Sequence, residues 1–217
     1  MEQKQEPLQI AIVALSGRGK TMSFRNCDTE TFGFINAEGK PLPFPNKFKN
    51  YSKPRTWTDM IKVLIEYGKD PKIEAVGFDS FSAFLDNLFE FANANRSGYE
   101  IFNFFNAEVG KFLNLIKRFP KPLFVTAHYE ATENADGVME THIKTKGKEW
   151  KGSLEREFTC VMFADVKVIA EDKRDYFFTL NSDGRTSAKT PPYLFGEGVN
   201  KIPNDVNYIL KTIKEKQ

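Results

Sequence analysis

A loop of small and charged residues near the start of the chain has the composition of a phosphate-binding site. Residues 14–21 read Ala-Leu-Ser-Gly-Arg-Gly-Lys-Thr. The glycines allow successive backbone N–H groups to converge on phosphate oxygens without a Cβ in the way. Lys20 can reach the β- and γ-phosphates of a nucleotide, and the Thr21 hydroxyl can ligate Mg²⁺. The predicted nucleotide-binding residues are Ser16, Gly17, Arg18, Gly19, Lys20, Thr21 and Met22.

The sequence on either side of this loop supports the same interpretation. Residues 10–13 predict a buried strand, and the chain after Thr21 is expected to form a helix whose N-terminus adds partial positive charge. The loop follows the G-x-x-x-x-G-K-[ST] pattern of a P-loop, except that Ala14 stands at the first glycine. Alanine is a mild replacement where φ is negative. The alternative is a chance Gly-Lys-Thr sequence in a surface turn.

Two acidic residues follow predicted strands and could complete such a site. Asp79 follows a predicted strand, residues 74–78, that ends in the apolar sequence Val-Gly-Phe, and it could hold Mg²⁺ through water, opposite Thr21. The alternative is that Asp79 caps the next helix. Because the next residue is Ser80, the base that activates water must come from elsewhere. Glu38 follows another predicted strand, and its carboxylate could orient or deprotonate water; the alternative is a solvated turn glutamate.

Strand-like and helix-like segments alternate along the chain. Short apolar runs predict buried strands, and apolar residues at helical spacing predict amphipathic helices. Residues 40–54 contain four prolines and are expected to be irregular. Strands are expected at residues 10–13, 31–36, 74–78, 123–126, 159–170 and 174–180, helices at 56–67, 84–95, 99–119 and 203–216, and a polar loop or hairpin at 130–153.

This order predicts an α/β fold with a mostly parallel sheet and helices on both faces. The last two strands are joined by a charged turn and are expected to form a C-terminal antiparallel extension. Ligands of such sheets bind at the carboxyl ends of the strands. We predict one domain over residues 1–217, with a core at about 8–200 and a closing helix at 203–216.

Composition bounds the classes of function. A chain of 217 residues can bury one sizeable core, and its net charge of +2 gives no global basic field, so DNA binding would need a local patch. Neither Cys27 and Cys160 nor His128 and His142 have a disulfide-framework or zinc-site spacing. The sequence shows neither a secretory signal pattern nor an apolar run of membrane-spanning length. We therefore expect a cytoplasmic protein without a membrane partner.

Four motifs together resemble the core of the RecA-type ATPases. They are the P-loop, FINAEG at 34–39, VGFDS at 76–80 and LFVTAH at 123–128. The resemblance implies a RecA-like, Mg²⁺-dependent ATPase in which Glu38 activates water and Asp79 is the Walker B carboxylate. It also implies that His128, where RecA has a glutamine, senses the γ-phosphate. The compact length is most similar to the phage nucleotide-binding proteins of this class, which include single-strand annealing recombinases.

A basic segment after the fourth predicted strand could contact DNA. Residues 144–156 contain five basic and two acidic residues around Trp150. Lysines can follow the phosphates of single-stranded DNA while an exposed aromatic side chain stacks on a base. The resemblance to RecA places a DNA-contacting loop here. The alternative is a solvated hairpin with Trp150 packed inward. The candidate DNA-binding residues are Lys146, Lys148, Trp150 and Lys151.

Two basic residues near the end of the core are candidates for contact with a neighbouring subunit. Arg185 and Lys189 follow a Ser-Asp-Gly turn at residues 182–184. RecA-like ATPases place basic residues in this region to reach the γ-phosphate of the neighbouring subunit, which implies a homo-oligomer. The alternative is that both are surface residues without a role.

The sequence therefore predicts an ATP-binding and ATP-hydrolysing RecA-like phage protein that acts in DNA recombination or single-strand annealing. Lys20, Glu38 and His128 are its predicted catalytic residues, and Thr21 and Asp79 its predicted metal ligands, with ATP and Mg²⁺ as cofactors. Its expected partners are single-stranded DNA, further copies of itself and a single-strand-binding protein. Two alternatives remain open: a nucleotide-gated switch or loader for a replication partner, and a P-loop small-molecule kinase.

Overall fold

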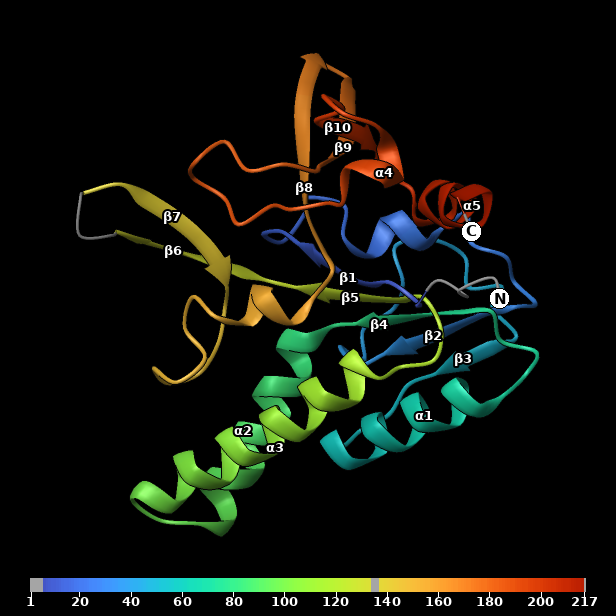
Figure 1. Ribbon diagram of the computed structural model, residues 1–217. Coiled ribbons are helices and arrows are strands. Elements are labelled where there is room, and N and C mark those ends of the chain that lie inside the picture. The colour runs from blue at the N-terminus through green and yellow to red at the C-terminus, as the bar shows by residue number, and fades with distance from the viewer. Residues whose placement is uncertain (1–5, 134–136, 217) are drawn as a thin grey trace, which may run out of the picture.

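The centre of the molecule is an eight-stranded sheet with the strand order β10-β9-β8-β1-β5-β4-β2-β3 (Figure 1). The computed structural model describes residues 6–133 and 137–216. In this sheet the pairs β3–β2, β2–β4, β4–β5, β5–β1 and β1–β8 are parallel, and the pairs β8–β9 and β9–β10 are antiparallel. The strands are β1 (Gln9–Val13), β2 (Phe32–Asn36), β3 (Asn50–Ser52), β4 (Ala75–Asp79), β5 (Leu123–Ala127), β8 (Cys160–Ala170), β9 (Lys173–Thr179) and β10 (Lys201–Pro203).

Helices cover both faces of this sheet (Figure 1). One face carries α1 (Trp57–Lys69), α2 (Phe81–Asn95) and α3 (Tyr99–Lys117); the other carries the 3₁₀ turn η1 (Thr21–Phe24), the short α4 (Pro192–Phe195) and α5 (Val206–Lys216). Because both faces are covered, all five residues of β1, β2, β4 and β5 are buried. The predicted α/β fold with its antiparallel C-terminal extension is confirmed. Within the described residues, none of these helices has the length and apolarity needed to cross a membrane.

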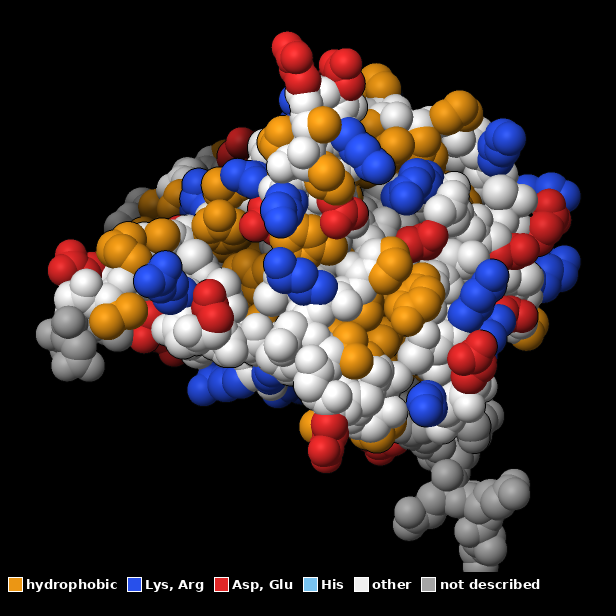
Figure 2. Space-filling model, turned by 90° about the horizontal axis from the view of Figure 1, so that it is seen from above, with side chains coloured by type: hydrophobic (Ala, Val, Ile, Leu, Met, Phe, Trp, Pro, Cys, Tyr) orange, Lys and Arg blue, Asp and Glu red, His pale blue; other side chains and the backbone are white. Residues whose placement is uncertain are grey.

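Two hairpins project from the sheet (Figure 1). The strands β6 (Tyr129–Glu133) and β7 (Met139–Ile143) form a separate two-stranded sheet, as expected for a hairpin between residues 130 and 153, and a short 3₁₀ turn, η2 (Leu154–Glu157), follows. The ribbon formed by β8 and β9 extends beyond the strands that flank it. Its outer part exposes Val168 (64%) and Ile169 (55%). Seen from above (Figure 2), basic, acidic and apolar side chains are interspersed around this ribbon.

The expectation of a helix directly after the P-loop is wrong. The chain makes only the four-residue 3₁₀ turn η1 before it continues to β2. Local side-chain hydrogen bonds compete with the helix here. The Ser23 hydroxyl donates to Lys20 O at 2.6 Å, and an Asp28 carboxylate oxygen accepts from the backbone N–H groups of Glu30 and Thr31. The phosphate site therefore lacks the dipole of a full helix.

Three smaller elements also differ from the sequence-based expectation. The proline-rich segment contains β3, which pairs with β2 at the edge of the sheet. The closing helix begins at Val206 rather than at residue 203, because Pro203 pairs with Phe177 in β10. Asp205 then precedes the helix and accepts from the N–H of Asn207 at 2.9 Å. The short helix α4 was not expected.

A close approach of two phenylalanines explains the glycine in the middle of β4. A Cβ on Gly77 would lie 2.8 Å from the Phe24 ring and 3.0 Å from the Phe32 ring. These rings belong to the core on the face covered by α5 and η1. Gly77 thus lets Phe24 press the chain just after the P-loop against the sheet.

We predict opposite effects on stability for two glycine-to-alanine substitutions. Gly77→Ala overpacks this core and should lower the free energy of unfolding by about 1–3 kcal/mol. Gly110→Ala is the matched control: it lies in the middle of α3, where a Cβ would meet only the Trp150 ring at 3.7 Å. Because alanine has a higher helix propensity than glycine, Gly110→Ala should raise the free energy of unfolding by up to about 1 kcal/mol. Denaturant unfolding measures both; a neutral Gly77→Ala would show that the rings move aside freely.

Candidate functional site

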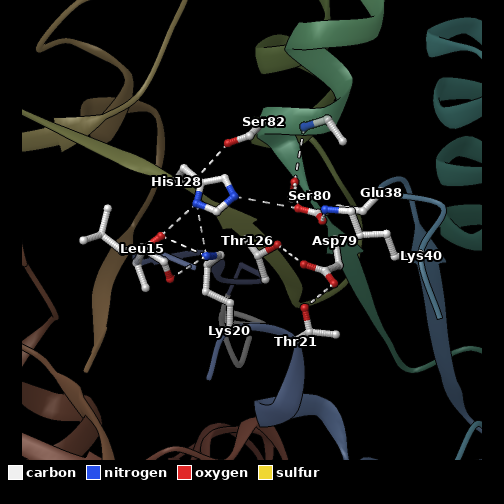
Figure 3. Close-up of polar contacts among 12 residues, drawn as sticks. Leu15, Lys20, Thr21, Glu38, Lys40, Asp79, Ser80, Ser82, Thr126 and His128 are labelled. Atoms are coloured by element: carbon white, nitrogen blue, oxygen red, sulfur yellow. Dashed lines mark hydrogen bonds and ion pairs between the residues drawn. The ribbon is translucent and has the colours of Figure 1, made fainter. Parts of the chain in front are cut away.

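The ends of four parallel strands bring the predicted catalytic residues together (Figure 3). Ala14 follows β1, Glu38 follows β2, Asp79 ends β4 and His128 follows β5. The backbone ties these ends to one another: Ala14 N–H donates to Ala127 O at 3.1 Å, and Glu38 N–H donates to Asp79 O at 3.1 Å. Glu38, Asp79 and His128 thus lie together at one edge of the sheet.

Lys20 lies at the centre of this group and is 7% exposed. Its ammonium donates to the carbonyl oxygens of Ala14 at 2.9 Å and Leu15 at 3.0 Å. Burial lowers the pKa of Lys20, while the charges of Asp79 and Glu38 oppose this shift. The nearby carboxylates thus help to keep a buried ammonium charged in the phosphate-binding loop.

Asp79 is buried against two threonine hydroxyls. One carboxylate oxygen accepts from Thr21 Oγ1 at 2.7 Å, and the other accepts from Thr126 Oγ1. Burial raises the pKa of Asp79, and these two hydrogen bonds oppose the shift. The structure therefore places the two predicted metal ligands, Thr21 and Asp79, in direct contact.

This pair of oxygen ligands fits Mg²⁺. In the part of the chain that the structure describes, no group of three or more His, Cys, Asp or Glu side chains is arranged to hold a metal. Mg²⁺ in nucleotide sites, however, is usually bound by one or two protein oxygens, with phosphate oxygens and waters as the other ligands. A hydroxyl and a carboxylate beside the P-loop match that type of site.

The Glu38 carboxylate has defined partners and is not a freely solvated turn residue. Its Oε1 accepts from the Ser80 hydroxyl at 3.0 Å, and its Oε2 lies 3.4 Å from Lys40 Nζ. The His128 Nε2 lies 3.9 Å from Oε1, and the Glu38 side chain is 24% exposed. The carboxylate is held beside the site, with enough exposure to meet water there.

His128 connects the P-loop with two other segments. Its Nδ1 lies 3.3 Å from Lys20 Nζ and 3.2 Å from Ala14 O, and its backbone N–H donates to Ser82 Oγ at 2.9 Å. Burial and then the charge of Lys20 lower the pKa of His128, so the neutral imidazole prevails at pH 7. A neutral ring at this position can exchange one hydrogen-bond partner for another.

Two cavities meet at Glu38 and His128. The first, of about 470 Å³, lies over the P-loop, and the second, of about 860 Å³, lies on the side of α2. Both volumes are in the range of small-molecule sites. The first is lined by Ser16, Gly17, Gly19, Lys20, Thr21, Met22, Glu38, Lys40, Pro43, His128 and Tyr176. Of the predicted nucleotide-binding residues, Arg18 does not line it; its side chain pairs with Asp165 of β8 at 2.7 Å.

The predicted DNA-binding segment adjoins His128, but Trp150 is packed rather than free. The N–H of Lys144 donates to His128 O at 2.8 Å. Lys148 and Lys151 are exposed, whereas Lys146 pairs with Asp86 of α2 at 2.7 Å. The Trp150 ring packs against the hydrophobic core beside α3, which matches the inward-packed alternative.

Arg185 and Lys189 lie in the segment between β9 and α4, and both residues are exposed. The Arg185 carbonyl accepts from the N–H of Thr141 in β7, and the Lys189 backbone pairs with Val161 in β8. The backbone of the segment is thereby fixed while both basic side chains face solvent. A role toward a neighbouring subunit remains a prediction.

Several residues of the site were missed by the sequence analysis. Thr126 carried a detectable signal, because it is the polar residue of an otherwise apolar strand, Leu-Phe-Val-Thr-Ala. Lys40 lies two residues after Glu38, and Ser82 lies three residues after Asp79. Tyr176 and Pro43 carried no signal, since only the tertiary fold brings them to the P-loop.

No protein-family model matches this chain, and no curated protein matches it significantly. Among solved structures, the chain is similar to the crystal structure of the KaiC-like protein PH0186 from the hyperthermophilic archaeon Pyrococcus horikoshii OT3. The two sequences are 11% identical, the match covers 86% of this chain and 83% of that chain, and the TM-score is 0.49.

Proposed function

We propose that this protein binds ATP with Mg²⁺ at the P-loop and hydrolyses it. The observation that carries this proposal is the buried group formed by Lys20, Thr21 and Asp79, with Glu38 and His128 beside it. Burying charged groups costs free energy. A ligand with negative charge and bound Mg²⁺ would match both the buried ammonium and the buried carboxylate.

Each residue contributes to binding by charge or by hydrogen bonding. The Lys20 ammonium would exchange its loop carbonyl partners for phosphate oxygens. Bound Mg²⁺ would neutralise charge on the phosphates. Thr21 and Asp79 would hold the ion, and its proximity would return the raised pKa of Asp79 toward the usual range. Catalysis would then depend mainly on positioning and electrostatic stabilisation.

Glu38 is the residue that would activate water. Its carboxylate accepts one hydrogen bond from Ser80, which orients it, and lies next to the larger cavity, from which water can enter. Because this carboxylate is partly exposed, water can reach it, and it can accept a proton from that water in the transition state. His128 would lie next to the γ-phosphate and exchange its contact with Lys20 for one with phosphate.

Two substitutions separate binding from chemistry. Lys20→Ala should abolish ATP binding, because it removes the positive charge that would bind the β- and γ-phosphates. Glu38→Gln should keep ATP binding and lower the hydrolysis rate by about 10²–10⁴-fold, because an amide cannot accept the proton. Calorimetric titration and phosphate release measure the two effects, and Glu66→Gln on the exposed side of α1 is the control.

Normal turnover by Glu38→Gln would show that the base lies elsewhere. Tight ATP binding by the wild-type protein without turnover would contradict the ATPase proposal. A nucleotide-gated switch would then be the better description.

We further propose that the ATPase acts on single-stranded DNA in recombination or annealing, through residues 144–156. The support is their direct backbone contact with His128 and the exposure of Lys148 and Lys151. A change at the γ-phosphate that moves His128 would thus be passed directly to Lys144, the first residue of this segment. Phosphate contacts rather than base stacking would supply the affinity, because Trp150 is packed inward.

Replacing Lys148 and Lys151 by Ala should weaken binding of single-stranded DNA and reduce its salt dependence. Each lost phosphate contact should change the log–log slope by about 0.7. Lys69→Ala with Lys72→Ala, two exposed lysines around the end of α1, is the matched control. Trp150→Ala should lower thermal stability instead, and loss of DNA binding by folded Trp150→Ala protein would restore the stacking role. An unchanged salt slope in the Lys148 and Lys151 variant would place any DNA site elsewhere.

We also propose that the protein acts as a homo-oligomer in which Arg185 or Lys189 reaches the neighbouring active site. Hydrolysis per subunit should then rise steeply with protein concentration. Mixing Lys189→Ala subunits with Glu38→Gln subunits should restore part of the activity, because each supplies what the other lacks. Arg185→Ala is tested in the same way. Constant specific activity on dilution, with no rescue by either mixture, would exclude a residue acting between subunits.

A further inference from the structure

The cavity over the P-loop has a wall that the phosphate-binding motif does not supply. Tyr176 comes from β9 and Pro43 from the proline-rich segment, yet both line the same cavity of about 470 Å³ as Gly19, Lys20 and Thr21. Neither side chain carries a charge. This part of the cavity is therefore suited to a different portion of the ligand than the phosphates.

The fold holds the Tyr176 ring toward the P-loop. Side chains alternate along a strand, so Tyr176 points to the same face of the sheet as Phe178, which is buried in the core beside α5. Phe177 points to the opposite face, where Lys201 Nζ lies 4.3 Å from its ring centre. The Tyr176 carbonyl accepts from the N–H of Asn204 at 3.2 Å, which fixes the backbone at this point.

The Tyr176 ring lies directly against the loop. A Cβ on Gly19 would be 3.0 Å from Tyr176 Cδ1 and 3.2 Å from Asn204 Nδ2. Gly19 also has a φ of +89°, so two independent constraints require glycine here. The contact sets the aromatic ring next to the residue that precedes Lys20, at one end of the phosphate-binding loop.

Tyr176 nevertheless remains 39% exposed. A side chain that served only the core would be covered, as Phe178 is (0% exposed). The Tyr176 ring lines the cavity, whose other apolar side chains outside residues 14–21 are Met22 and Pro43. A half-covered aromatic ring beside a phosphate site is suited to the π-face of a base.

We propose that Tyr176 stacks on the nucleobase of the bound nucleotide, with Pro43 and Met22 as the apolar surroundings of the base. This inference rests on the proposed nucleotide site and adds the part of the ligand that the P-loop does not bind. Since every base has a π-face, stacking by Tyr176 supplies affinity with little preference between bases.

The test compares ATP with inorganic tripolyphosphate, which has the phosphates but no base. With Mg²⁺ present, Tyr176→Ala should weaken ATP binding by about 5- to 100-fold and leave tripolyphosphate binding unchanged. Tyr176→Phe should bind both ligands as the wild type does. Tyr208→Ala is the matched control, since Tyr208 on α5 is similarly exposed (43%) and does not line the cavity.

Three outcomes would overturn the proposal. Equal loss of ATP and tripolyphosphate binding would show that Tyr176 only shapes the P-loop. Unchanged ATP binding would place the base elsewhere. Absence of binding of either ligand to the wild type would remove the proposed function itself, which the first two outcomes leave intact.

A second variant keeps the test decisive if Tyr176→Ala does not fold. Tyr176→Trp retains a ring, and its added fluorescence, relative to the wild type, should be quenched by ATP and not by tripolyphosphate. Quenching by both ligands, or by neither, would contradict stacking on the base.

Discussion

The buried carboxylate of Asp79 is the constraint around which the site is arranged. A carboxylate without water requires hydrogen bonds or opposite charge, and here Thr21 and Thr126 supply the first while Lys20 supplies the second. Lys20 in turn depends on Asp79 and Glu38 to offset the cost of its own burial. Removing one of these groups would leave another buried without compensation, so the site functions as one electrostatic unit.

The parallel sheet makes this arrangement possible. In the register of the sheet, Val13 lies beside Ala127, and Asn36 lies beside Asp79. The residues that follow these pairs must therefore leave the sheet at the same edge. Helices on both faces exclude water from the strands below, while the loops above remain accessible. The site residues therefore lie at the boundary between the buried strands and the accessible loops.

The sequence was sufficient to predict the features that depend on local pattern, namely the central strands and the polar residues at their ends. Apolar runs located every central strand, and polar residues at the ends of those runs located Glu38, Asp79 and His128. The missing helix after the P-loop was not predictable from periodicity alone, because periodicity does not report side-chain hydrogen bonds such as those at Ser23 and Asp28, which compete with a helix. Contacts between distant segments were beyond the sequence altogether: no local signal indicates that Tyr176 reaches Gly19 or that Trp150 packs beside α3.

The position of β1 in the sheet has a consequence for folding during synthesis on the ribosome. Gln9 pairs with Leu123, and Ile10 pairs with Cys160, so this central strand is made long before either of its neighbours. At ordinary rates of translation, roughly 5–20 s pass before β5 is made, and until then both edges of β1 are unpaired. The nascent chain thus carries an apolar, aggregation-prone strand that only later synthesis can cover, and slow closure of such non-local pairings makes protection by chaperones valuable.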